Sequence, residues 1–394
     1  MKQFFSATDD DISKGRTTDV YFTHTMEVLR ARGKTKEQAL AEFTVSGLPR
    51  GWPWGVFCGV EETVRLFEGK NLDLWGLPEG TVFRPRGESG VRIPVMTISG
   101  AYSDYCVYET PALGFLCHSS GVATMSARVR KAAGDKQVIA FGIRRMHPSI
   151  SPMLDRSSFI GGCDAVSSLK GAETIGRKPS GTMPHSLVIM FGDQREAFKA
   201  FDEAVDRSVP RVALVDTYSD EKAEAIMACE SIKELEGVRL DTPASRKGSM
   251  PELIREVKWE LSIRGFDHVK IFVSGGLDDK TIPELVAAGA DGFGVGTSIS
   301  NAPTIDFALD IVEKGGKPVA KRGKYGGRKY PFRCPKCLSF EVSLSLKRPP
   351  KCRCGGKMEL AEVQLIRKGK RLYPERSAIE IRESVLEQLA RAEM

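Results

Sequence analysis

Four short runs of β-branched and apolar residues between residues 212 and 300 constrain the fold of this chain more than any other feature. The runs cover residues 213–217, 238–242, 271–276 and 292–298. Segments with helical character separate them, at residues 219–234, 250–264 and 280–288. Short apolar runs suit strands that are buried on both faces. Strands that alternate with helices form right-handed units of a parallel sheet, so the sequence predicts an α/β fold.

These predicted strands end in polar or glycine-rich residues. Two end in Asp-Thr, at Asp216 and Asp241, and the other two end at Ser274, Gly275 and Gly276 and at Gly294, Gly296 and Thr297. The carboxyl ends of parallel strands hold the active sites of α/β barrels, and phosphate sites tend to follow the last two strands. We therefore expect an anion-binding mouth in which the two carboxylates face ribose hydroxyls, a magnesium pyrophosphate or a cationic sugar. The alternative is that both aspartates cap the helices that follow.

Basic residues extend this pattern. Arg239 lies two residues before Asp241, so both side chains point to the same side of the strand. Residues 138–146 form the first predicted barrel strand and end in Arg144 and Arg145, of which only one can face the mouth. His185 follows a Gly- and Pro-containing loop, and a lone histidine in such a loop is ordinarily solvated or capping.

The order of patterns along the chain predicts four regions. We expect an N-terminal α+β domain of the open-sandwich type over residues 1–112, with helices at 23–32 and 35–42. An irregular α/β barrel follows over residues 113–305. A longer helical stretch, residues 102–133, is expected to break near Gly121. A return segment then covers residues 306–330, and a zinc-knuckle domain covers residues 331–394.

The zinc prediction rests on two close pairs of cysteines. Cys334 and Cys337 are followed, after fourteen residues, by Cys352 and Cys354. Two such pairs supply the four thiolates of a tetrahedral structural zinc, and a disulfide pair or free thiols are the alternative. No open coordination position is implied, so we expect no catalytic role for this metal.

Composition limits the function. Residues 314–358 contain 14 Lys and Arg and one acid, which is a net charge of about +13. The whole chain has a net charge of +7, so the remaining residues together carry about −6. The basic charge therefore belongs to one segment and does not mark the whole chain as a nucleic-acid binder. The other five cysteines stand singly in apolar segments, as buried intracellular thiols do. No signal peptide or membrane-spanning run is apparent, so a cytoplasmic protein is expected. Two Asn beside many Lys and Glu lean towards a thermophile.

Seven segments of the chain together resemble a known family, the type II phosphoribosyltransferases. They are residues 19–22 (Asp-Val-Tyr-Phe), 141–145 (Phe-Gly-Ile-Arg-Arg), 181–185 (Gly-Thr-Met-Pro-His), 215–218 (Val-Asp-Thr-Tyr), 239–241 (Arg-Leu-Asp), 273–276 (Val-Ser-Gly-Gly) and 294–297 (Gly-Val-Gly-Thr). The resemblance runs through nearly the whole chain. Within the family, the archaeal nicotinate phosphoribosyltransferases are the most similar, because they carry a similar four-cysteine tail.

The resemblance implies a reaction and its partners. Nicotinate would displace pyrophosphate from 5-phosphoribosyl-1-pyrophosphate, bound with Mg²⁺, to give nicotinate mononucleotide for NAD biosynthesis. ATP hydrolysis would be coupled to this step, as in a ligase, through transient phosphorylation of His185. A homo-oligomer, either a dimer or a trimer of dimers, would share its sites across a dimer interface.

The resemblance also implies roles for residues. Tyr21 from a partner subunit would stack on one face of the pyridine ring and Phe141 on the other. Arg144 and Thr182 would contact the carboxylate of nicotinate. Because strict alternation puts Phe141 and Arg144 on opposite faces, the strand would have to end or bulge between them. Sugar and pyrophosphate would be lined by Asp216, Arg239 and Asp241, and the 5′-phosphate by the glycine-rich strand ends.

Three other functions remain open from sequence. Quinolinate phosphoribosyltransferase has a similar barrel and a segment like residues 120–124, but its substrate has two carboxylates and needs more cations in the base pocket. Nicotinamide phosphoribosyltransferase needs an Asp that accepts from the amide of the base. A nucleic-acid-binding protein that acts through the basic zinc tail is the alternative from another class.

Overall fold

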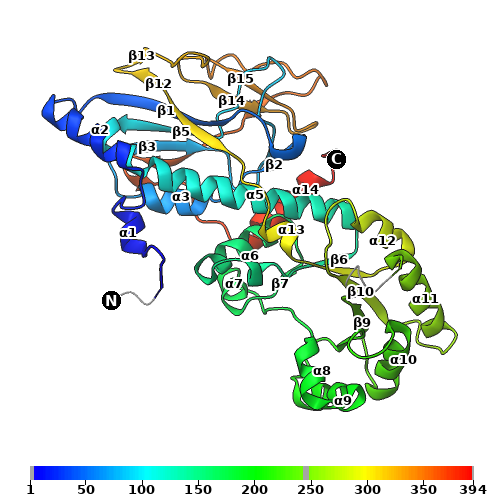
Figure 1. Cartoon of the computed structure of the whole chain (residues 1–394). Helices are drawn as coiled ribbons and strands as arrows, with labels where there is room; N and C mark the ends of the chain where they lie inside the picture. The colour runs from blue at the N-terminus through cyan, green and yellow to red at the C-terminus, as the bar shows by residue number, and fades with distance from the viewer. Residues whose placement is uncertain (1–3, 243–247, 393–394) are drawn as a thin grey trace. The chain divides into compact units, whose positions relative to one another are not determined.

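The computed structural model describes residues 4–242 and 248–392, shown in Figure 1. The chain divides into two compact units. Unit 1 contains Met1–Thr124 and Pro303–Met394, so it is built from both ends of the chain, and unit 2 contains Met125–Ala302. The division of the chain into four regions stays a prediction.

Unit 1 is organised around an antiparallel seven-stranded sheet. Its order is β13 (Lys317–Pro318), β12 (Phe307–Lys314), β1 (Gln38–Val45), β5 (Met96–Ala101), β3 (Leu72–Gly76), β17 (Val363–Arg367) and β18 (Lys370–Arg371). Strand β1 replaces the helix expected over residues 35–42. The first five residues of β1, Gln38 to Glu42, are good helix formers, but seven of its eight side chains are buried in the sheet, and this tertiary context outweighs local propensity.

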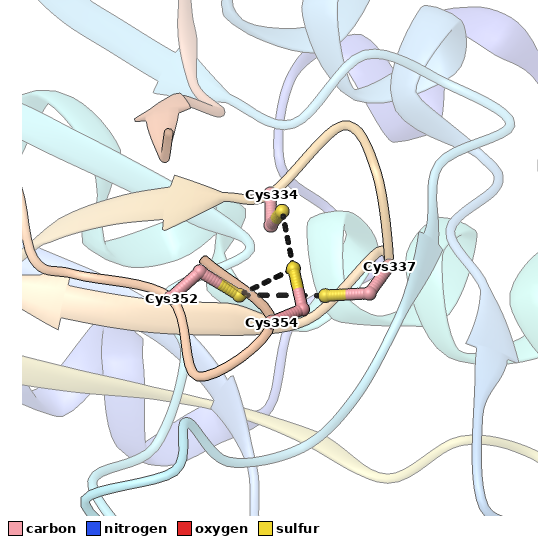
Figure 2. Close-up of side chains that lie close together, drawn as sticks. All are labelled: Cys334, Cys337, Cys352 and Cys354. Atoms are coloured by element: carbon pink, nitrogen blue, oxygen red, sulfur yellow. Dashed lines mark hydrogen bonds between the residues drawn. The ribbon is translucent and has the colours of Figure 1, made fainter. Parts of the chain in front are cut away.

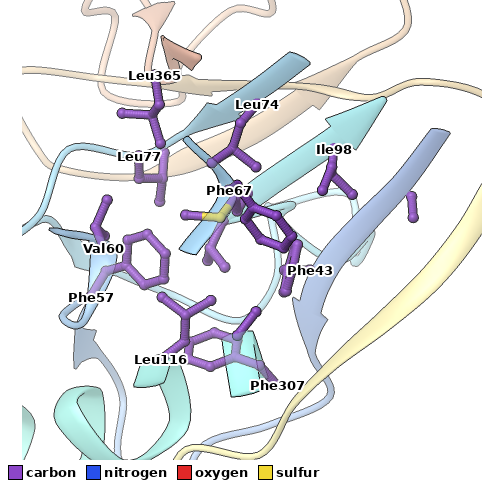
Figure 3. Packing of buried hydrophobic residues seen from close by; sticks show 14 of the residues in the cluster. Phe43, Phe57, Val60, Phe67, Leu74, Leu77, Ile98, Leu116, Phe307 and Leu365 are labelled. Carbon is purple, nitrogen blue, oxygen red and sulfur yellow. The ribbon is translucent and has the colours of Figure 1, made fainter. Parts of the chain in front are cut away.

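Helices and short strands complete this unit. They are α1 (Asp9–Ser13), α2 (Val20–Ala31), η1 (Pro49–Gly51), β2 (Gly55–Val56), α3 (Val60–Phe67), β4 (Val82–Phe83), α4 (Tyr102–Tyr105), η2 (Cys106–Tyr108) and α14 (Ala378–Leu389). The core beside the sheet is rich in aromatic side chains, as Figure 3 shows for Phe43, Phe57, Phe67 and Phe307. The rings of Phe57 and Phe307 meet edge to face with centroids 5.8 Å apart.

Helix α5 (Glu109–Ala133) begins in unit 1 and ends in unit 2. It runs without the break expected near Gly121. A Cβ at Gly121 would lie 2.3 Å from the carbonyl oxygen of Pro303, so the glycine serves a close backbone contact and does not interrupt the helix.

The C-terminal segment forms a small sheet of β14 (Tyr330–Arg333), β15 (Phe340–Ser343) and β16 (Glu359–Leu360). Two buried ion pairs join residues 328 and 329, which precede β14, to acids in or beside the seven-stranded sheet. Nζ of Lys329 lies 2.9 Å from Oε2 of Glu42, and Nη2 of Arg328 lies 2.9 Å from Oε1 of Glu362. The guanidinium of Arg328 also lies 4.1 Å from the ring centroid of Trp75.

Unit 2 contains a parallel six-stranded sheet. Its order is β7 (Ala165–Val166), β6 (Gln137–Ala140), β11 (Gly292–Val295), β10 (Lys270–Ser274), β9 (Gly237–Leu240) and β8 (Val212–Leu214). The four runs that opened the sequence analysis are β8 to β11, as predicted. Among the described residues no pairing joins the edge strands β7 and β8, so the expected barrel is an open half-barrel.

Helices alternate with these strands. They are η3 (Ile143–Arg145), η4 (Pro148–Ile150), α6 (Ser151–Ile160), α7 (Leu169–Thr174), α8 (His185–Phe191), α9 (Gln194–Ala204), α10 (Glu221–Ser231), α11 (Met250–Ser262), α12 (Ile282–Ala288) and α13 (Thr297–Ser300). None of the helices in residues 4–242 and 248–392 is both long and apolar enough to cross a membrane.

Candidate active site

A cavity of about 970 Å³ lies in unit 2 where the parallel strands end. Eleven of the residues predicted from sequence line it. They are Phe141, Arg144, Thr182, Arg239, Asp241, Ser274, Gly275, Gly276, Gly294, Gly296 and Thr297. The residues predicted from the strand ends and those implied by the resemblance, such as Phe141 and Thr182, therefore line the same cavity.

The two glycine-rich strand ends form one side of this cavity. Gly275 and Gly276 have φ values of 92° and 70°, which glycine adopts without the strain that a Cβ would bring. The hydroxyl of Ser274 donates to Oδ1 of Asp241 at 2.7 Å and so fixes that carboxylate. Backbone amides in such glycine-rich turns suit an anion such as phosphate.

His185 faces both predicted carboxylates. Its Nε2 lies 3.7 Å from Oδ1 of Asp216 and 3.8 Å from Oδ2 of Asp241. Its Nδ1 lies 3.1 Å from the hydroxyl oxygen of Thr217. His185 begins helix α8, Asp216 and Thr217 follow β8, and Asp241 follows β9, so three segments meet here.

The surroundings of Asp216 and Arg239 shift the pKa values of both side chains. The side chain of Asp216 is 3% exposed, and its Oδ1 has no hydrogen-bond partner among the described residues. Burial raises the pKa of Asp216 to about 6, His185 opposes this shift, and the charge of Asp241 adds to it. Burial also lowers the pKa of Arg239, against the attraction of the two aspartates.

Phe141 and Arg144 both line the cavity, which strict alternation along one strand would not allow. Strand β6 ends at Ala140, so the strand expected over residues 138–146 is shorter than predicted, and the chain turns into a 3-10 helix. The strict alternation of a strand does not apply there. Arg144 and Arg145 both line the cavity, and the expectation that only one of them could face it is wrong. Phe141 packs on Gly294, where a Cβ would lie 2.4 Å from its ring.

Tyr21 belongs to unit 1. It lies on α2 with 56% of its surface exposed and is not among the residues that line the cavity. Its predicted role against a pyridine ring in a partner subunit stays a prediction.

Sequence reasoning missed Thr217 as a partner of His185. The Asp-Thr ending of the strand was noted, but the threonine was not assigned a role. The contact spans 32 residues and depends on where α8 lies, which no local pattern reports.

The four tail cysteines converge on one point, as Figure 2 shows. All four sulfurs lie within 4.8 Å of one another, and the sulfurs of Cys334 and Cys354, Cys337 and Cys352, and Cys352 and Cys354 are 3.6, 3.4 and 3.4 Å apart. These distances are too long for a disulfide bond of about 2.0 Å. They are close to the separation of about 3.8 Å between sulfurs that each lie about 2.3 Å from one tetrahedral zinc. The residues therefore fit a structural metal ion.

The fold and the site together define a class, the α/β proteins with a parallel half-barrel whose strand ends combine carboxylates, arginines and glycine-rich turns around one cavity. Comparisons with known proteins give the family within this class. Residues 19–120 match the model of the quinolinate phosphoribosyl transferase N-terminal domain, and residues 122–310 match that of the C-terminal domain. The chain belongs to the quinolinate phosphoribosyl transferase family.

Individual relatives carry two kinds of name. A solved structure described as nicotinate-nucleotide pyrophosphorylase from Pyrococcus furiosus is 49% identical, with a TM-score of 0.95 over 99% of both chains. A nicotinate phosphoribosyltransferase of Mycobacterium tuberculosis is 31% identical over 296 residues, which are 71% of this chain and 63% of that protein. The chain thus spans less than two thirds of that relative. The human nicotinic acid phosphoribosyltransferase structure, 19% identical with a TM-score of 0.75 over 95% of this chain and 94% of its own, shares the fold.

Proposed function

We propose that this chain is a nicotinate phosphoribosyltransferase, which makes nicotinate mononucleotide and pyrophosphate from nicotinate and 5-phosphoribosyl-1-pyrophosphate in NAD biosynthesis. The observation that carries the proposal is the cavity in which Arg239, Asp241 and two glycine-rich strand ends meet beside His185 and Asp216. Relatives named nicotinate phosphoribosyltransferase support it. The solved structure named nicotinate-nucleotide pyrophosphorylase shares the nucleotide and the pyrophosphate with this reaction, and both nicotinate transfer and quinolinate transfer form that nucleotide.

The chemistry follows from this arrangement. The pyridine nitrogen of nicotinate forms a bond to C1 of the ribose, and the bond from C1 to the pyrophosphate oxygen breaks. Pyrophosphate leaves with the bonding electrons. Positive charge develops on the ribose ring, and Asp216 and Asp241 stabilise it directly or by holding Mg²⁺ with the pyrophosphate. Arg239 is the cation beside the leaving group.

The base would bind at the β6 end of the cavity. The ring of Phe141 offers one flat face for the pyridine, and Arg144 with Thr182 offers donors to the single carboxylate of nicotinate. Tyr21 of a second subunit would cover the other face in the proposed shared site of a dimer or a trimer of dimers.

ATP coupling would use His185. Its Nδ1 lies against the hydroxyl of Thr217, which can donate to or accept from that nitrogen, and its Nε2 faces two carboxylates. The ring nitrogen that carries no proton would attack the γ-phosphorus of ATP, and the bond from that phosphorus to the oxygen of ADP would break. Water would later cleave the P–N bond and release phosphate. Two carboxylates within 3.8 Å of Nε2 support a role for this imidazole, because they would stabilise the positive charge that it gains when a ring nitrogen bonds to phosphorus.

The remaining assignments complete the proposal. The four cysteines would hold a structural zinc and take no part in transfer. The strong similarity to the Pyrococcus furiosus protein over 99% of both chains supports a place in the archaeal, thermophilic branch. A cytoplasmic location and the four-region domain division belong to the same proposal.

Quinolinate transfer is the second candidate, because the matching family models are described by that substrate. In that reaction the carboxylate at position 2 of the pyridine leaves as carbon dioxide after transfer. Two carboxylates would have to be bound, and Arg145 also lines the cavity and would be the second cation.

The test is turnover of the purified protein with 5-phosphoribosyl-1-pyrophosphate and Mg²⁺. Nicotinate, nicotinamide and quinolinate are offered in parallel, each with and without ATP, and the mononucleotide is followed by mass. We expect product from nicotinate, increased by ATP and reduced in His185→Ala. Product from quinolinate alone, with carbon dioxide, would move the assignment to the sister reaction, and product from nicotinamide alone to the amide enzyme. If no base reacts, RNA binding by the full chain and by a variant with neutralised tail lysines tests the basic tail.

A further inference from the structure

We propose that Glu224 and Thr217 are positioning residues that set the ring orientation of His185. Glu224 would hold the loop after β8, and the loop would present the hydroxyl of Thr217 to Nδ1 of the imidazole. The inference rests on the proposed function of His185 as the phosphorylated residue, and it adds the reason why one ring nitrogen faces the carboxylates.

Glu224 is a buried carboxylate with four donors. Glu224 is fully buried, with 0% of its surface exposed. Oε1 accepts from the backbone N–H groups of Tyr218 and Ser219, both at 2.6 Å. Oε2 accepts from the backbone N–H of Thr217 at 2.9 Å and from Nε2 of Gln194 at 2.8 Å. Three consecutive backbone amides are thus fixed by one side chain.

The amide of Thr217 connects this network to His185. Thr217 is bonded through its backbone to Glu224 and through its hydroxyl, at 3.1 Å, to Nδ1 of His185. With Nδ1 held, Nε2 points towards Asp216 and Asp241. The chain of contacts runs from a buried acid to the imidazole in two hydrogen bonds.

Gln194 anchors the acid from the other side. Its amide nitrogen donates to Glu224 and also to the backbone oxygen of Leu214, at 3.0 Å, in the last residue of β8. Gln194 is the first residue of α9, which follows α8 after a short turn, so the helix that carries His185 and the strand end share one buried network.

Glu224 is not needed as the cap of its own helix. Helix α10 is already capped by Asp220, whose carboxylate accepts from the backbone N–H of Ala223 at 2.9 Å. Burying a carboxylate is costly unless several donors compensate it. A buried acid whose donors are the loop beside His185 is therefore better explained by the need to hold that loop in one conformation.

The direct test reads the imidazole itself. Protein labelled with ¹⁵N-histidine contains five histidines, and His185→Gln assigns the signal of interest. At a fixed pH we expect wild-type His185 to hold its proton on one ring nitrogen, in a single tautomer. Thr217→Val, which deletes the hydroxyl but keeps the shape, should give a mixture of the two tautomers, and Thr217→Ser should restore the wild-type form.

A kinetic test joins this readout to the proposed phosphorylation. Loss of one neutral hydrogen bond corresponds to roughly 3- to 10-fold in rate, so Thr217→Val should lower the rate of phosphoryl transfer from ATP to His185 by that factor. Glu224→Gln should act in the same direction, because its amide nitrogen cannot accept from two of the four donors. Glu230→Gln is the matched control, since it removes an acid of the same helix that pairs on the surface with Arg195.

The outcomes separate the two proposals. Unchanged tautomers in Thr217→Val and Glu224→Gln would overturn the positioning role, whatever the activity. If no base gives product and ATP does not label His185, the proposed function fails, while the tautomer readout still decides the geometry. If Glu224→Gln does not fold, Thr217→Val and Thr217→Ser carry the test alone.

Discussion

Replacing Asp216 by asparagine should stabilise the folded protein above pH 6 while it weakens catalysis. The aspartate combines a side chain that is almost fully buried with an oxygen that has no hydrogen-bond partner among the described residues. A charge in such a place is costly. Asparagine has nearly the same shape and no charge, so the substitution isolates the electrostatic contribution.

The pKa shift of this residue sets the magnitude. Burial, opposed by His185, raises the pKa from 3.8 to about 6. This difference corresponds to about 3 kcal/mol of unfolding free energy, and screening by water in the cavity reduces the expected gain to roughly 1–2 kcal/mol. Below pH 3.8 the carboxyl is protonated in both the folded and the unfolded wild-type protein, so the two proteins should be equally stable there. The wild-type protein loses stability relative to the variant as the pH rises towards 6, and above that pH the difference stays constant.

Calorimetric unfolding between pH 4.5 and pH 8 measures this difference. Hydrogen exchange in β8 reports on unit 2 separately, which matters because a chain with two units need not unfold in one step. Asp135→Asn is the control, since the Asp135 side chain is 86% exposed and its charge should not matter. Turnover of the Asp216→Asn variant should fall by roughly 100-fold if the charge stabilises the transition state.

Two results would refute this reasoning. A variant that is less stable than the wild-type protein at pH 8 would mean that the buried charge is compensated. A stability difference that does not change between pH 4.5 and pH 8 would mean that burial does not raise the pKa of Asp216.

Three further predictions concern other parts of the molecule. Cys352→Ser should reduce the bound metal, measured by elemental analysis, from about one ion per chain to near zero, and retention of a full equivalent would exclude the cysteine site. Gly294→Ala should push Phe141 from its place and cost roughly 1–3 kcal/mol of stability, with a raised KM for the base, because a Cβ would lie 2.4 Å from the ring; wild-type thermal stability would contradict the close packing. Lys329→Met should cost about 3–5 kcal/mol, because it leaves Glu42, 1% exposed, without its cation. Restoration of stability in the double variant Lys329→Met, Glu42→Leu would identify the unpaired charge as the cause.

The parallel sheet could be predicted because its signal is local. Each of β8 to β11 is a short apolar run, and the residues that line the cavity follow directly from where those runs end. Asp241 and Ser274 were placed in the mouth by this rule alone, and their hydrogen bond of 2.7 Å shows that the two strand ends are neighbours. The cluster of four cysteines could likewise be predicted from spacing, because two cysteines close in sequence are already close in space and only the two pairs have to meet.

Other features depend on contacts that local sequence does not report. Strand β1 begins with five good helix formers, Gln38 to Glu42, and these residues become part of a strand because β5 and β12 pair with β1 from both sides. Gly121 was expected to break the helix, but the helix continues through it, and the close backbone of Pro303 explains why a glycine stands there. The contact of Thr217 with His185 depends on the path of the chain through α8 to α10, which includes the buried network around Glu224.

The discontinuous make-up of unit 1 has a consequence for biosynthesis. Strand β1 pairs with β12, and β3 pairs with β17, so residues from the first quarter of the chain find these partners only after residue 307 and residue 363 have left the ribosome. Unit 2, by contrast, is one continuous segment that emerges in between. Domains tend to fold as units during translation, whereas pairings between distant strands form slowly. The half-barrel is therefore expected to fold while the part of the sheet made of β1, β5 and β3 still has unpaired edges, which pair only after β12 and β17 have been synthesised.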